Sequence, residues 1–307
     1  MDGMPEPNGA LVLEDRGIVV VGGDDRVAFL QGLISNDVAS AGARAIYAAL
    51  LTPQGKYLHD LFTVPADGVH LLDCEAARAE DLARRLKPYR LRAKVTIDVA
   101  PQTYRVAALL GPVALQRAGL DPASGGPPPG TTVAFGGGWA FIDPRLPVLG
   151  GRAVLPAETS SATLSALRVP LLSAADYDEW RLALGVPDGS RDLVPEKSIL
   201  LESGFDELNG IAWDKGCWMG QELTARTKYR GLVKKRLLPV DVDGPLPPPG
   251  TEVMLDDREA GEIRSGRGTR ALALLRLEHL ATARETGQPL RAGDAMLTPR
   301  IPAWARL

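Results

Sequence analysis

The segment around Cys217 contains the residue types best suited to chemistry. It reads Asp-Lys-Gly-Cys-Trp-Met-Gly-Gln-Glu over residues 214–222, so two glycines bracket a single thiol. Glycine lets the backbone turn sharply and approach a ligand closely. The residues from Gln221 onward favour a helix that ends before Gly231, which places Cys217 just ahead of a helix N-terminus. The positive end of that helix and the neighbouring Lys215 both favour thiolate over thiol.

We therefore expect Cys217 to be a reactive or metal-ligating thiolate with a lowered pKa. The spacing fits a buried cysteine in a tight turn equally well. The other cysteine, Cys74, ends an apolar strand, which predicts an inert core thiol. Two cysteines exclude a disulfide scaffold and a cluster held by four cysteines of this chain. The three histidines are scattered singly, so a metal site built on them is not expected.

Basic residues gather beside this thiol. Residues 215–236 contain seven basic side chains and one acidic side chain, a net charge of +6, whereas the whole chain carries −3. Such a local positive field predicts an anionic ligand, an acidic partner or RNA. The same pattern also suits an ordinary solvated helix face followed by a charged strand.

Glu202 is the second singular residue, because it closes a short apolar run and is followed by Ser-Gly. A carboxylate at such a position can accept two parallel hydrogen bonds from an amidine-like edge, such as that of a pterin. The sequence alone favours a simpler interpretation, in which Glu202 is an exposed acid after a strand or a partner of a helix cap.

The order of the surrounding elements predicts the scaffold that must position these residues. Strands are expected at 45–51, 57–64, 68–74, 93–99 and 104–110, with a strand pair within 11–21 and helices at 26–34, 76–86 and 112–118. A hairpin over 131–142, a helix-rich zone over 157–184 with Asp176 as a cap, and a short-stranded β-domain from residue 235 follow. This order indicates an α+β fold with antiparallel sheets.

Composition limits the class of protein. The chain has 307 residues, of which 45% are hydrophobic, enough for about two or three globular domains. Neither a P-loop nor a dinucleotide-binding glycine motif is present. Apolar runs are too short to span a membrane, and the N-terminal residues lack the pattern of a signal or transit peptide. We therefore expect a cytoplasmic protein without a membrane partner.

Residues 215–231, together with the basic residues 234–236, resemble the signature of the YgfZ family of folate-binding iron–sulfur cluster assembly proteins. That family is related to the glycine-cleavage T protein. The resemblance continues at 177–187, 193–196 and 201–204, and upstream at 29–32, 35–37 and 51–56, so it covers most of the chain. The sequence around Glu222 looks closest to the mitochondrial, cluster-maturation branch. Trp218 departs from the Tyr or Phe usual after the cysteine.

The resemblance implies a three-domain cloverleaf of the T-protein type around a central folate-sized channel. The expected domains are a split folate-binding-type domain that carries the KGCxxGQE motif (1–48 plus 168–236), a ferredoxin-like middle domain (49–167) and a C-terminal β-barrel (237–307).

The resemblance also implies a role for the thiol. Cys217 corresponds to the signature cysteine, with Lys215 beside it, and would be one ligand of a transient cluster shared with an A-type iron–sulfur carrier protein. Client iron–sulfur enzymes, including radical enzymes that modify tRNA, would receive the cluster. A single ligand cannot hold a cluster by itself, because clusters usually need four.

The same resemblance implies tetrahydrofolate as a cofactor, with Glu202 at the position that holds the pterin. The remaining members of the expected cofactor site are Gly216, Gly220, Gln221, Glu222 and Arg226. T proteins lack a cysteine in this loop, so the thiol favours cluster work over catalysis, and Asp37 is too weak a match to their carboxylate to be assigned as catalytic. The alternatives are a tetrahydrofolate-dependent aminomethyltransferase and an accessory protein that binds tRNA.

Overall fold

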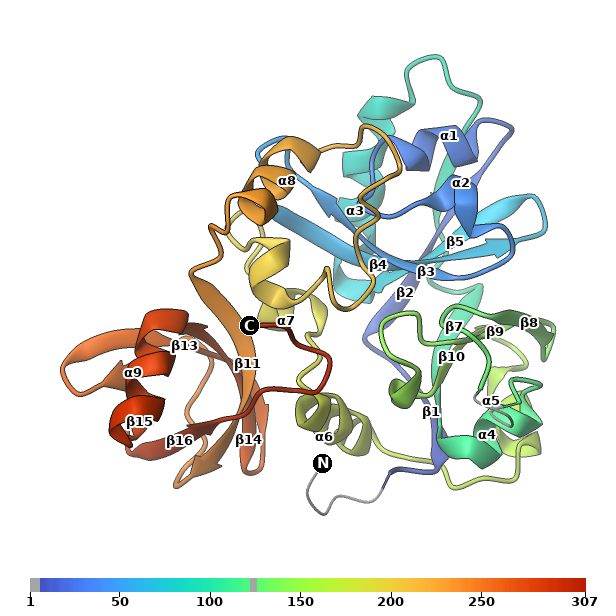
Figure 1. Ribbon diagram of the computed structural model, residues 1–307. Coiled ribbons are helices and arrows are strands. Elements are labelled where there is room, and N and C mark those ends of the chain that lie inside the picture. The colour runs from blue at the N-terminus through green and yellow to red at the C-terminus, as the bar shows by residue number, and fades with distance from the viewer. Residues whose placement is uncertain (1–5, 122–125) are drawn as a thin grey trace.

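The structure is a computed structural model that describes residues 6–121 and 126–307. Its described residues form three lobes (Figure 1), built on two five-stranded antiparallel sheets and a closed six-stranded barrel. The expected combination of antiparallel sheets with a C-terminal barrel is confirmed. None of the helices in the described ranges has the length and apolar character that crossing a bilayer requires.

The first sheet carries the helices that will position the thiol. Its strand order is β3-β4-β5-β2-β6, with β2 (Arg16–Gly22), β3 (Ile46–Leu51), β4 (Tyr57–Ala66), β5 (Val69–Glu75) and β6 (Thr96–Val99). Helices α1 (Arg26–Gln31), α2 (Val38–Ala41) and α3 (Ala79–Leu86) belong to the same lobe. Strand β4 is buried on both faces, since Leu58 and Leu61 enter one core while Phe62 and Val64 enter another.

The second sheet has the order β1-β7-β10-β9-β8. Its strands are β1 (Gly9–Val12), β7 (Tyr104–Leu110), β8 (Thr132–Phe135), β9 (Gly138–Ile142) and β10 (Gly151–Pro156), with helices α4 (Gly111–Arg117) and α5 (Ser160–Ala166) beside them. The segment expected as one domain, 49–167, therefore contributes strands to both sheets.

The strand pair expected within 11–21 is wrong in one respect. Both strands exist, but β1 pairs with β7 and β2 pairs with β5 and β6. The chain crosses from one sheet to the other after Leu13, whose amide donates to the carbonyl of Val106. The two strands therefore serve different cores: Ala10 packs beneath the second sheet and Val19 beneath the first.

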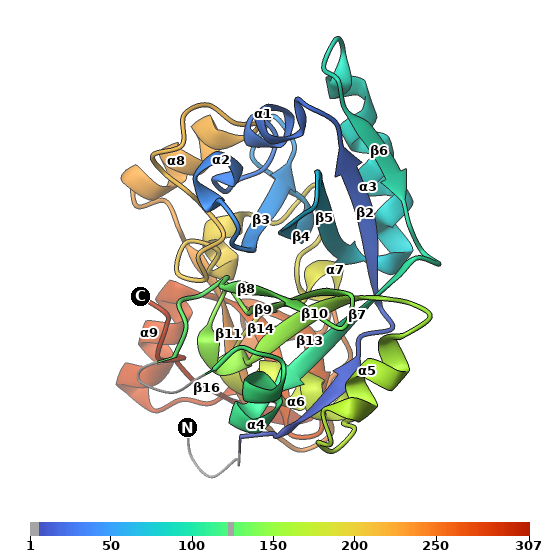
Figure 2. The ribbon, with the colours of Figure 1, turned by 90° about the vertical axis from the view of Figure 1, so that its right-hand side faces the viewer.

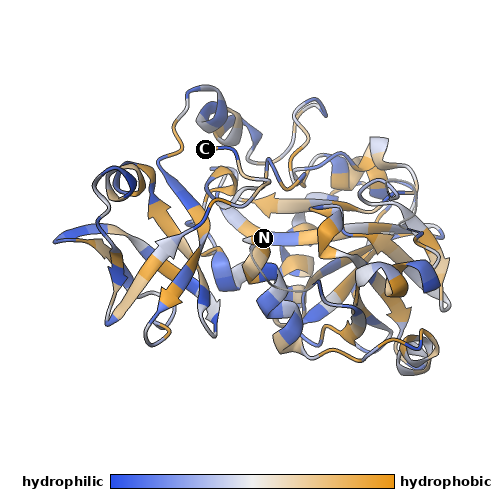
Figure 3. Ribbon diagram, turned by 60° about the horizontal axis from the view of Figure 1, so that its bottom comes forward, coloured by the Kyte–Doolittle hydropathy of each residue, from blue (hydrophilic) through white to orange (hydrophobic). Residues whose placement is uncertain are grey.

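The C-terminal lobe is the barrel. It contains β11 (Lys235–Asp243), β12 (Glu252–Leu255), β13 (Arg258–Arg267), β14 (Arg270–Arg276), β15 (Leu290–Ala292) and β16 (Ala295–Pro299), with α9 (Leu277–Thr286) on its outside. Its core is aliphatic and includes Val240, Val253, Ile263 and Leu297. Figure 3 shows hydrophobic residues concentrated in the strands of all three lobes.

Helix α6 (Ala174–Leu184) joins the barrel to the rest of the molecule by packing on β13 and β14. The sequence predicted Asp176 as the N-cap of this helix, and that prediction is wrong. The N-cap is Ser173, and Asp176 is the third helical residue, which completes a capping box with it. The hydroxyl of Ser173 accepts a hydrogen bond from the amide of Asp176, so the helix starts three residues before the predicted start at Tyr177. Within the joint, Arg181 binds Asp192 of α7 (Gly189–Asp192) at 2.8 Å and donates to Ser265 of the barrel at 2.7 Å.

Buried ion pairs fill the junction of the lobes. Asp73 on β5 accepts from Arg16 at 2.7 Å and from Arg152 at 2.8 Å, and Arg145 pairs with Asp143 at 2.7 Å. The cavity that remains among the three arginines has a volume of about 10 Å³, which is the space of about one water molecule. This junction therefore does not provide the expected folate-sized channel.

Candidate functional site around Cys217

The thiol lies in a loop that ends at α8 (Gln221–Tyr229), so the expected place ahead of a helix is confirmed. Gly220 precedes the helix at φ +84°, a conformation that favours glycine. A Cβ at Gly220 would lie 2.8 Å from the carbonyl oxygen of Thr52 and 2.9 Å from Leu51. Only glycine can therefore seat the loop against the turn between β3 and β4.

The two cysteines have opposite environments. Cys217 is exposed and free, whereas Cys74 on β5 is buried and free. Cys74 packs in the core of the first sheet, as expected, and burial raises the pKa of its thiol to about 12. Around Cys217, the described part of the chain offers no group of three or more His, Cys, Asp or Glu side chains that could hold a metal ion. Cys217 is therefore a single free thiol that is exposed to solvent.

The residue after the thiol ties the loop to the core. Trp218 is 6% exposed and packs into the largest hydrophobic cluster, and its indole Nε1 has no hydrogen-bond partner among the described residues. The next amide, that of Met219, donates to the carbonyl of Gly32 at 3.1 Å. The indole that replaces the usual Tyr or Phe is thus accommodated inside, while the adjacent sulfur faces outward.

Lys215 anchors the other side of the loop. Its ammonium donates to the carbonyls of Ile34 at 2.7 Å and Asn36 at 2.6 Å, in the segment between α1 and α2. Figure 2 shows the chain that leads into α8 running beside these two helices. Burial lowers the pKa of Lys215 to about 8, against an opposing effect of Asp37. Lys215 therefore positions the loop, and its effect on the thiol stays a prediction.

Gln31 is a further anchor that the sequence did not single out. Its side-chain nitrogen donates to Asp37 at 3.0 Å and to the carbonyl of Lys215 at 3.5 Å, and its oxygen accepts from the amide of Val38. Burial acts to raise the pKa of Asp37, but hydrogen bonds from Ser40 and Gln31 outweigh it and lower that pKa. Asp37, considered above as a match to a T-protein carboxylate, is the N-cap of α2. The only sequence signal for Gln31 was its place in the resembling segment 29–32.

The expected basic field is smaller than the sequence count suggests. Lys228 pairs with Asp206 at 3.0 Å and Arg236 pairs with Glu207 at 2.7 Å. Lys215 is directed to backbone carbonyls. The exposed cations of the stretch that form no ion pair with any described residue are Arg226, Arg230 and Lys234.

Glu202 lies apart from the thiol loop, in a short 3-10 helix (Leu200–Ser203). It is half-buried, and burial raises the pKa of its carboxyl against the opposing effects of Lys235 and Lys56. Lys56, one of these two lysines, ends the turn against which Gly220 packs. The side chain of Glu202 accepts no hydrogen bond from a described residue, so both of its carboxylate oxygens are available to a ligand.

The other expected cofactor residues all belong to the loop and the first turns of α8. Gly216 has φ +82° and open space around it. The amide of Gln221, the first residue of α8, donates to the carbonyl of Trp218. Glu222 and Arg226 are exposed on the helix. The structure therefore gathers these residues with Cys217 and Lys215 on one loop-and-helix unit.

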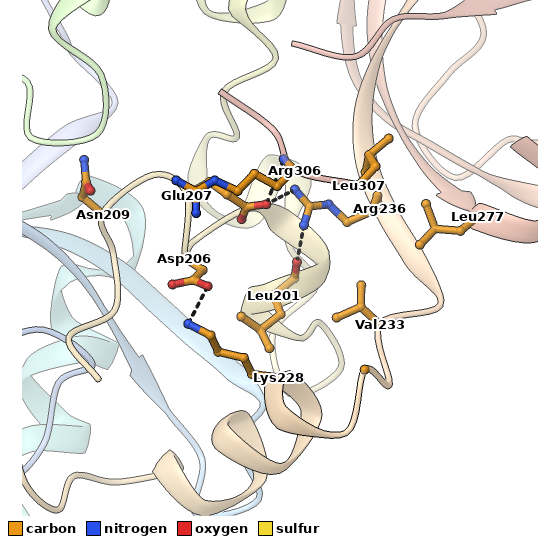
Figure 4. A pocket seen from close by; sticks show the side chains of 11 residues that line it. Leu201, Asp206, Glu207, Asn209, Lys228, Val233, Arg236, Leu277, Arg306 and Leu307 are labelled. Carbon is orange, nitrogen blue, oxygen red and sulfur yellow. Dashed lines mark hydrogen bonds and ion pairs between the residues drawn. The ribbon is translucent and has the colours of Figure 1, made fainter. Parts of the chain in front are cut away.

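A cavity of about 470 Å³ lies beside the C-terminal end of α8. Figure 4 shows the Lys228–Asp206 and Arg236–Glu207 pairs on its wall, together with the donation from Arg236 to the carbonyl of Leu201. Neither Cys217 nor Glu202 lines this cavity or the other three main cavities of the described residues. The exposed thiol therefore lies outside these four cavities.

Comparisons with known proteins agree with this arrangement. Residues 234–307 match the family model described as the CAF17 C-terminal beta-barrel domain. The mouse protein named iron-sulfur cluster assembly factor IBA57, mitochondrial, is 35% identical over 87% of this chain and 77% of its own length. Its human counterpart is 35% identical over 86% and 76%, respectively.

The fold has a solved relative. The glycine cleavage system aminomethyltransferase T from Bartonella henselae aligns with a TM-score of 0.76 over 97% of this chain and 86% of that chain. Because the two are 17% identical, this likeness shows the T-protein fold and no activity.

One expectation is contradicted by these relatives. They are named mitochondrial, which points to the mitochondrion and not to the cytoplasm, so the cytoplasmic expectation is wrong. The N-terminal pattern on which it rested gave too weak a signal. An exposed cysteine on an anchored loop, a T-protein fold and 35% identity to both mammalian proteins over 86–87% of this chain lead to one conclusion: the chain belongs to the IBA57 family of iron–sulfur cluster assembly factors.

Proposed function

We propose that this protein acts in cluster assembly by supplying Cys217 as one ligand of an iron–sulfur cluster whose other ligands come from a partner. The observation that carries the proposal is the exposure of Cys217 on a loop anchored by Lys215 and Trp218. The described residues contain no group of three or more His, Cys, Asp or Glu side chains that could complete a metal site. Since a cluster usually needs four protein ligands, the cluster must be shared.

The chemistry is a ligand exchange. Cys217 loses its thiol proton to solvent and its sulfur bonds to iron, while one ligand of the partner's cluster leaves. The protein contributes a fixed position for the sulfur: the loop is pinned by backbone contacts at both ends, so little conformational freedom is lost when iron binds.

The partner in this proposal is an A-type carrier protein, because such a carrier presents a cluster that can accept an outside thiolate. Client iron–sulfur enzymes, including radical enzymes that modify tRNA, would receive the completed cluster. Support comes from the names of the relatives, which describe cluster assembly factors.

Anaerobic reconstitution with an A-type carrier tests the proposal. Wild-type protein and the Cys74→Ala control are expected to give the same visible absorption and circular dichroism bands, distinct from those of the carrier alone. Cys217→Ser is expected to give the spectrum of the carrier alone. If Cys217→Ser and wild type gave the same spectrum, the shared-ligand mechanism would be wrong.

We further propose that tetrahydrofolate binds with its pterin edge on Glu202. The two free oxygens of this half-buried carboxylate fit the paired donors of a pterin, and Lys56 and Lys235 beside it favour its ionised form. The acidic tail at the other end of the cofactor would be attracted by the basic stretch 215–236. The junction of the lobes does not fit the cofactor, because ion pairs fill it. The cavity of about 470 Å³ is lined by Leu201, the neighbour of Glu202, which supports a folate site near this carboxylate.

Calorimetry with tetrahydrofolate tests whether Glu202 holds the pterin. Glu202→Ala is expected to weaken binding at least tenfold, while Glu285→Ala, which removes an exposed acid on α9 beside the barrel, is expected to bind like wild type. Equal affinities for wild type and Glu202→Ala would remove Glu202 from the site. Turnover of an aminomethyl donor with tetrahydrofolate that survives Cys217→Ser would identify a transferase instead.

A further inference from the structure

The outward side of α8 and the residues after it expose large apolar side chains. Tyr229 is 75% exposed, Leu232 47% and Leu223 37%. On a helix, residues 223, 226 and 230 lie on one side, because side chains three or four positions apart are neighbours. We call this surface the α8 face and define it by Leu223, Arg226, Tyr229, Arg230, Leu232 and Lys234.

The α8 face is also locally positive. Its three cations are exposed and form no ion pair with a described residue. Of the other four cations of the stretch, Lys228 pairs with Asp206, Arg236 pairs with Glu207 and Lys215 donates to backbone carbonyls. The fourth, Lys235, is half-buried at the start of β11. The chain as a whole carries −3, so this charge is a local feature that would orient an anionic partner.

Contacts inside the protein hold the aromatic residue of this face in place. The ring of Tyr229 meets that of Trp213 edge-on, with centroids 6.2 Å apart. The indole of Trp213 donates to Asp206 at 2.6 Å, and Lys228 lies 4.0 Å from the Trp213 ring centroid while pairing with Asp206. An exposed aromatic ring that is already fixed loses little entropy on binding, which is typical of interface hot spots.

The α8 face is rigidly connected to the thiol. Cys217 and α8 are joined by three residues, of which Trp218 is buried and Gly220 is seated on the β3–β4 turn. A partner that docks on α8 would therefore meet the sulfur in a fixed position.

We propose that the α8 face is the docking surface for a carrier protein that presents a thiolate-ligated cluster within an acidic rim. This inference rests on the function proposed above. A [2Fe–2S]²⁺ core held by four thiolates has a net charge of about −2, so charge complementarity favours its approach to Arg226, Arg230 and Lys234. The apolar residues between these cations then bury against the partner.

The chemistry of the face favours a protein over RNA. Nucleic-acid surfaces align many cations with phosphates. Here three cations alternate with leucines and a tyrosine, and the acidic Glu222 is exposed on the same helix. Such a mixture of apolar and arginine side chains is typical of protein interfaces.

Association kinetics with an A-type carrier reconstituted with a [2Fe–2S] cluster test the docking surface. The double variant Arg226→Glu/Arg230→Glu is expected to associate at least tenfold more slowly at low salt and to lose most of the salt dependence of wild type. Leu223→Ala/Tyr229→Ala is expected to dissociate at least tenfold faster. The matched control, Arg284→Glu/Arg291→Glu, makes the same charge change at exposed barrel positions and is expected to resemble wild type.

The proposed docking surface is wrong if Arg226→Glu/Arg230→Glu and the barrel control slow association equally. It is also wrong if Arg226→Glu/Arg230→Glu associates like wild type, or if wild type does not bind the carrier. Binding of tRNA by wild type, lost in Arg226→Glu/Arg230→Glu, together with an unchanged carrier interaction, would assign the face to RNA and also overturn the proposal.

Cys217→Ser separates this proposal from the shared-ligand function. It is expected to associate at the wild-type rate yet fail to form the shared cluster spectrum. If Cys217→Ser gave the wild-type spectrum while Arg226→Glu/Arg230→Glu associated slowly, the docking surface would be supported and the ligand role of Cys217 would be wrong. If Arg226→Glu/Arg230→Glu associated as rapidly as wild type while Cys217→Ser lost the shared-cluster spectrum, the ligand role would be supported and the docking surface would be wrong.

Discussion

The ammonium nitrogen of Lys215 lies 2.7 Å from the carbonyl oxygen of Ile34, a residue 181 positions earlier in the chain. With the second donation to Asn36, this contact fastens the thiol loop to the segment between α1 and α2. The lysine two residues before the thiol thus holds the loop, and the position of the sulfur depends on it.

Lys215→Met should therefore loosen the loop more than it weakens the fold. Removing hydrogen bonds from a charged group to two carbonyls is expected to cost about 1–2 kcal/mol in the free energy of unfolding. Proteolysis within 212–220 should become faster. Urea unfolding and limited proteolysis check both effects, with Lys94→Met, whose side chain is 78% exposed, as the control. A variant as resistant to proteolysis as wild type would show that Lys215 is not the anchor.

The two glycines around the thiol should respond differently to alanine. Both have positive φ, which costs a non-glycine residue about 1–2 kcal/mol. At Gly216 nothing lies within 4 Å of an added Cβ, so that cost is the whole effect. At Gly220 the Cβ would also meet the Thr52 carbonyl at 2.8 Å, so we expect a larger loss and a displaced loop. Unfolding free energies and the alkylation rate of Cys217 measure the difference; equal effects would contradict the close packing.

The buried pairs at the junction of the lobes should make Asp73 one of the most sensitive positions. Asp73→Asn leaves Arg16 and Arg152 in a buried site without their shared counter-charge. Breaking such a pair costs about 3–5 kcal/mol. Thermal unfolding followed by calorimetry checks this, with the exposed Asp98→Asn as the control. A loss below about 1 kcal/mol would mean that water enters the junction and solvates the arginines.

Two buried histidines should make the fold sensitive to acid. Burial lowers the pKa of both His59 and His70 to about 4. Their contribution to stability is present above the unfolded pKa of 6.5 and is lost as the pH falls through the folded pKa. Between these values each should change the unfolding free energy by up to about 1.4 kcal/mol per pH unit.

His70→Gln isolates one of these contributions. It should reduce the dependence on pH between 6.5 and 4 by the share of one histidine, since His70 makes no ion pair with a described residue. Denaturant unfolding at four or five pH values gives the slope. An unchanged slope in His70→Gln would show that His70 is protonated in the folded protein.

Local sequence patterns predicted the elements well where a turn or an alternation was sufficient. The turn at 52–56 between β3 and β4 and the strand-rich character of the chain from residue 235 followed from such patterns. The closure of those strands into a barrel was implied by the resemblance alone. The pairing of β1 with β7 did not, because it depends on which core each strand joins. The cap of α6 was misplaced because Ser173 and Asp176 are both good capping residues, and only their reciprocal hydrogen bonds distinguish them.

The candidate site was predicted in part for a related reason. The position of Cys217 ahead of α8 followed from the glycines and the helix pattern, but its exposure did not, because the same spacing fits a buried cysteine. The partners of Lys215 did not, since the backbone carbonyls of Ile34 and Asn36 have no sequence signature. The free positive charge of residues 215–236 was overestimated because Asp206 and Glu207, which pair with Lys228 and Arg236, lie before this stretch in the chain.

Protection of Cys217 from alkylation tests the shared-ligand account most directly. The protein is mixed anaerobically with an A-type carrier, with or without its cluster, pulsed with iodoacetamide and analysed by peptide mass spectrometry. The buried Cys74 serves as the unreactive internal standard. The account predicts rapid labelling of Cys217 with the cluster-free carrier and at least tenfold slower labelling when the cluster is present. Equal labelling of Cys217 in both mixtures would contradict it.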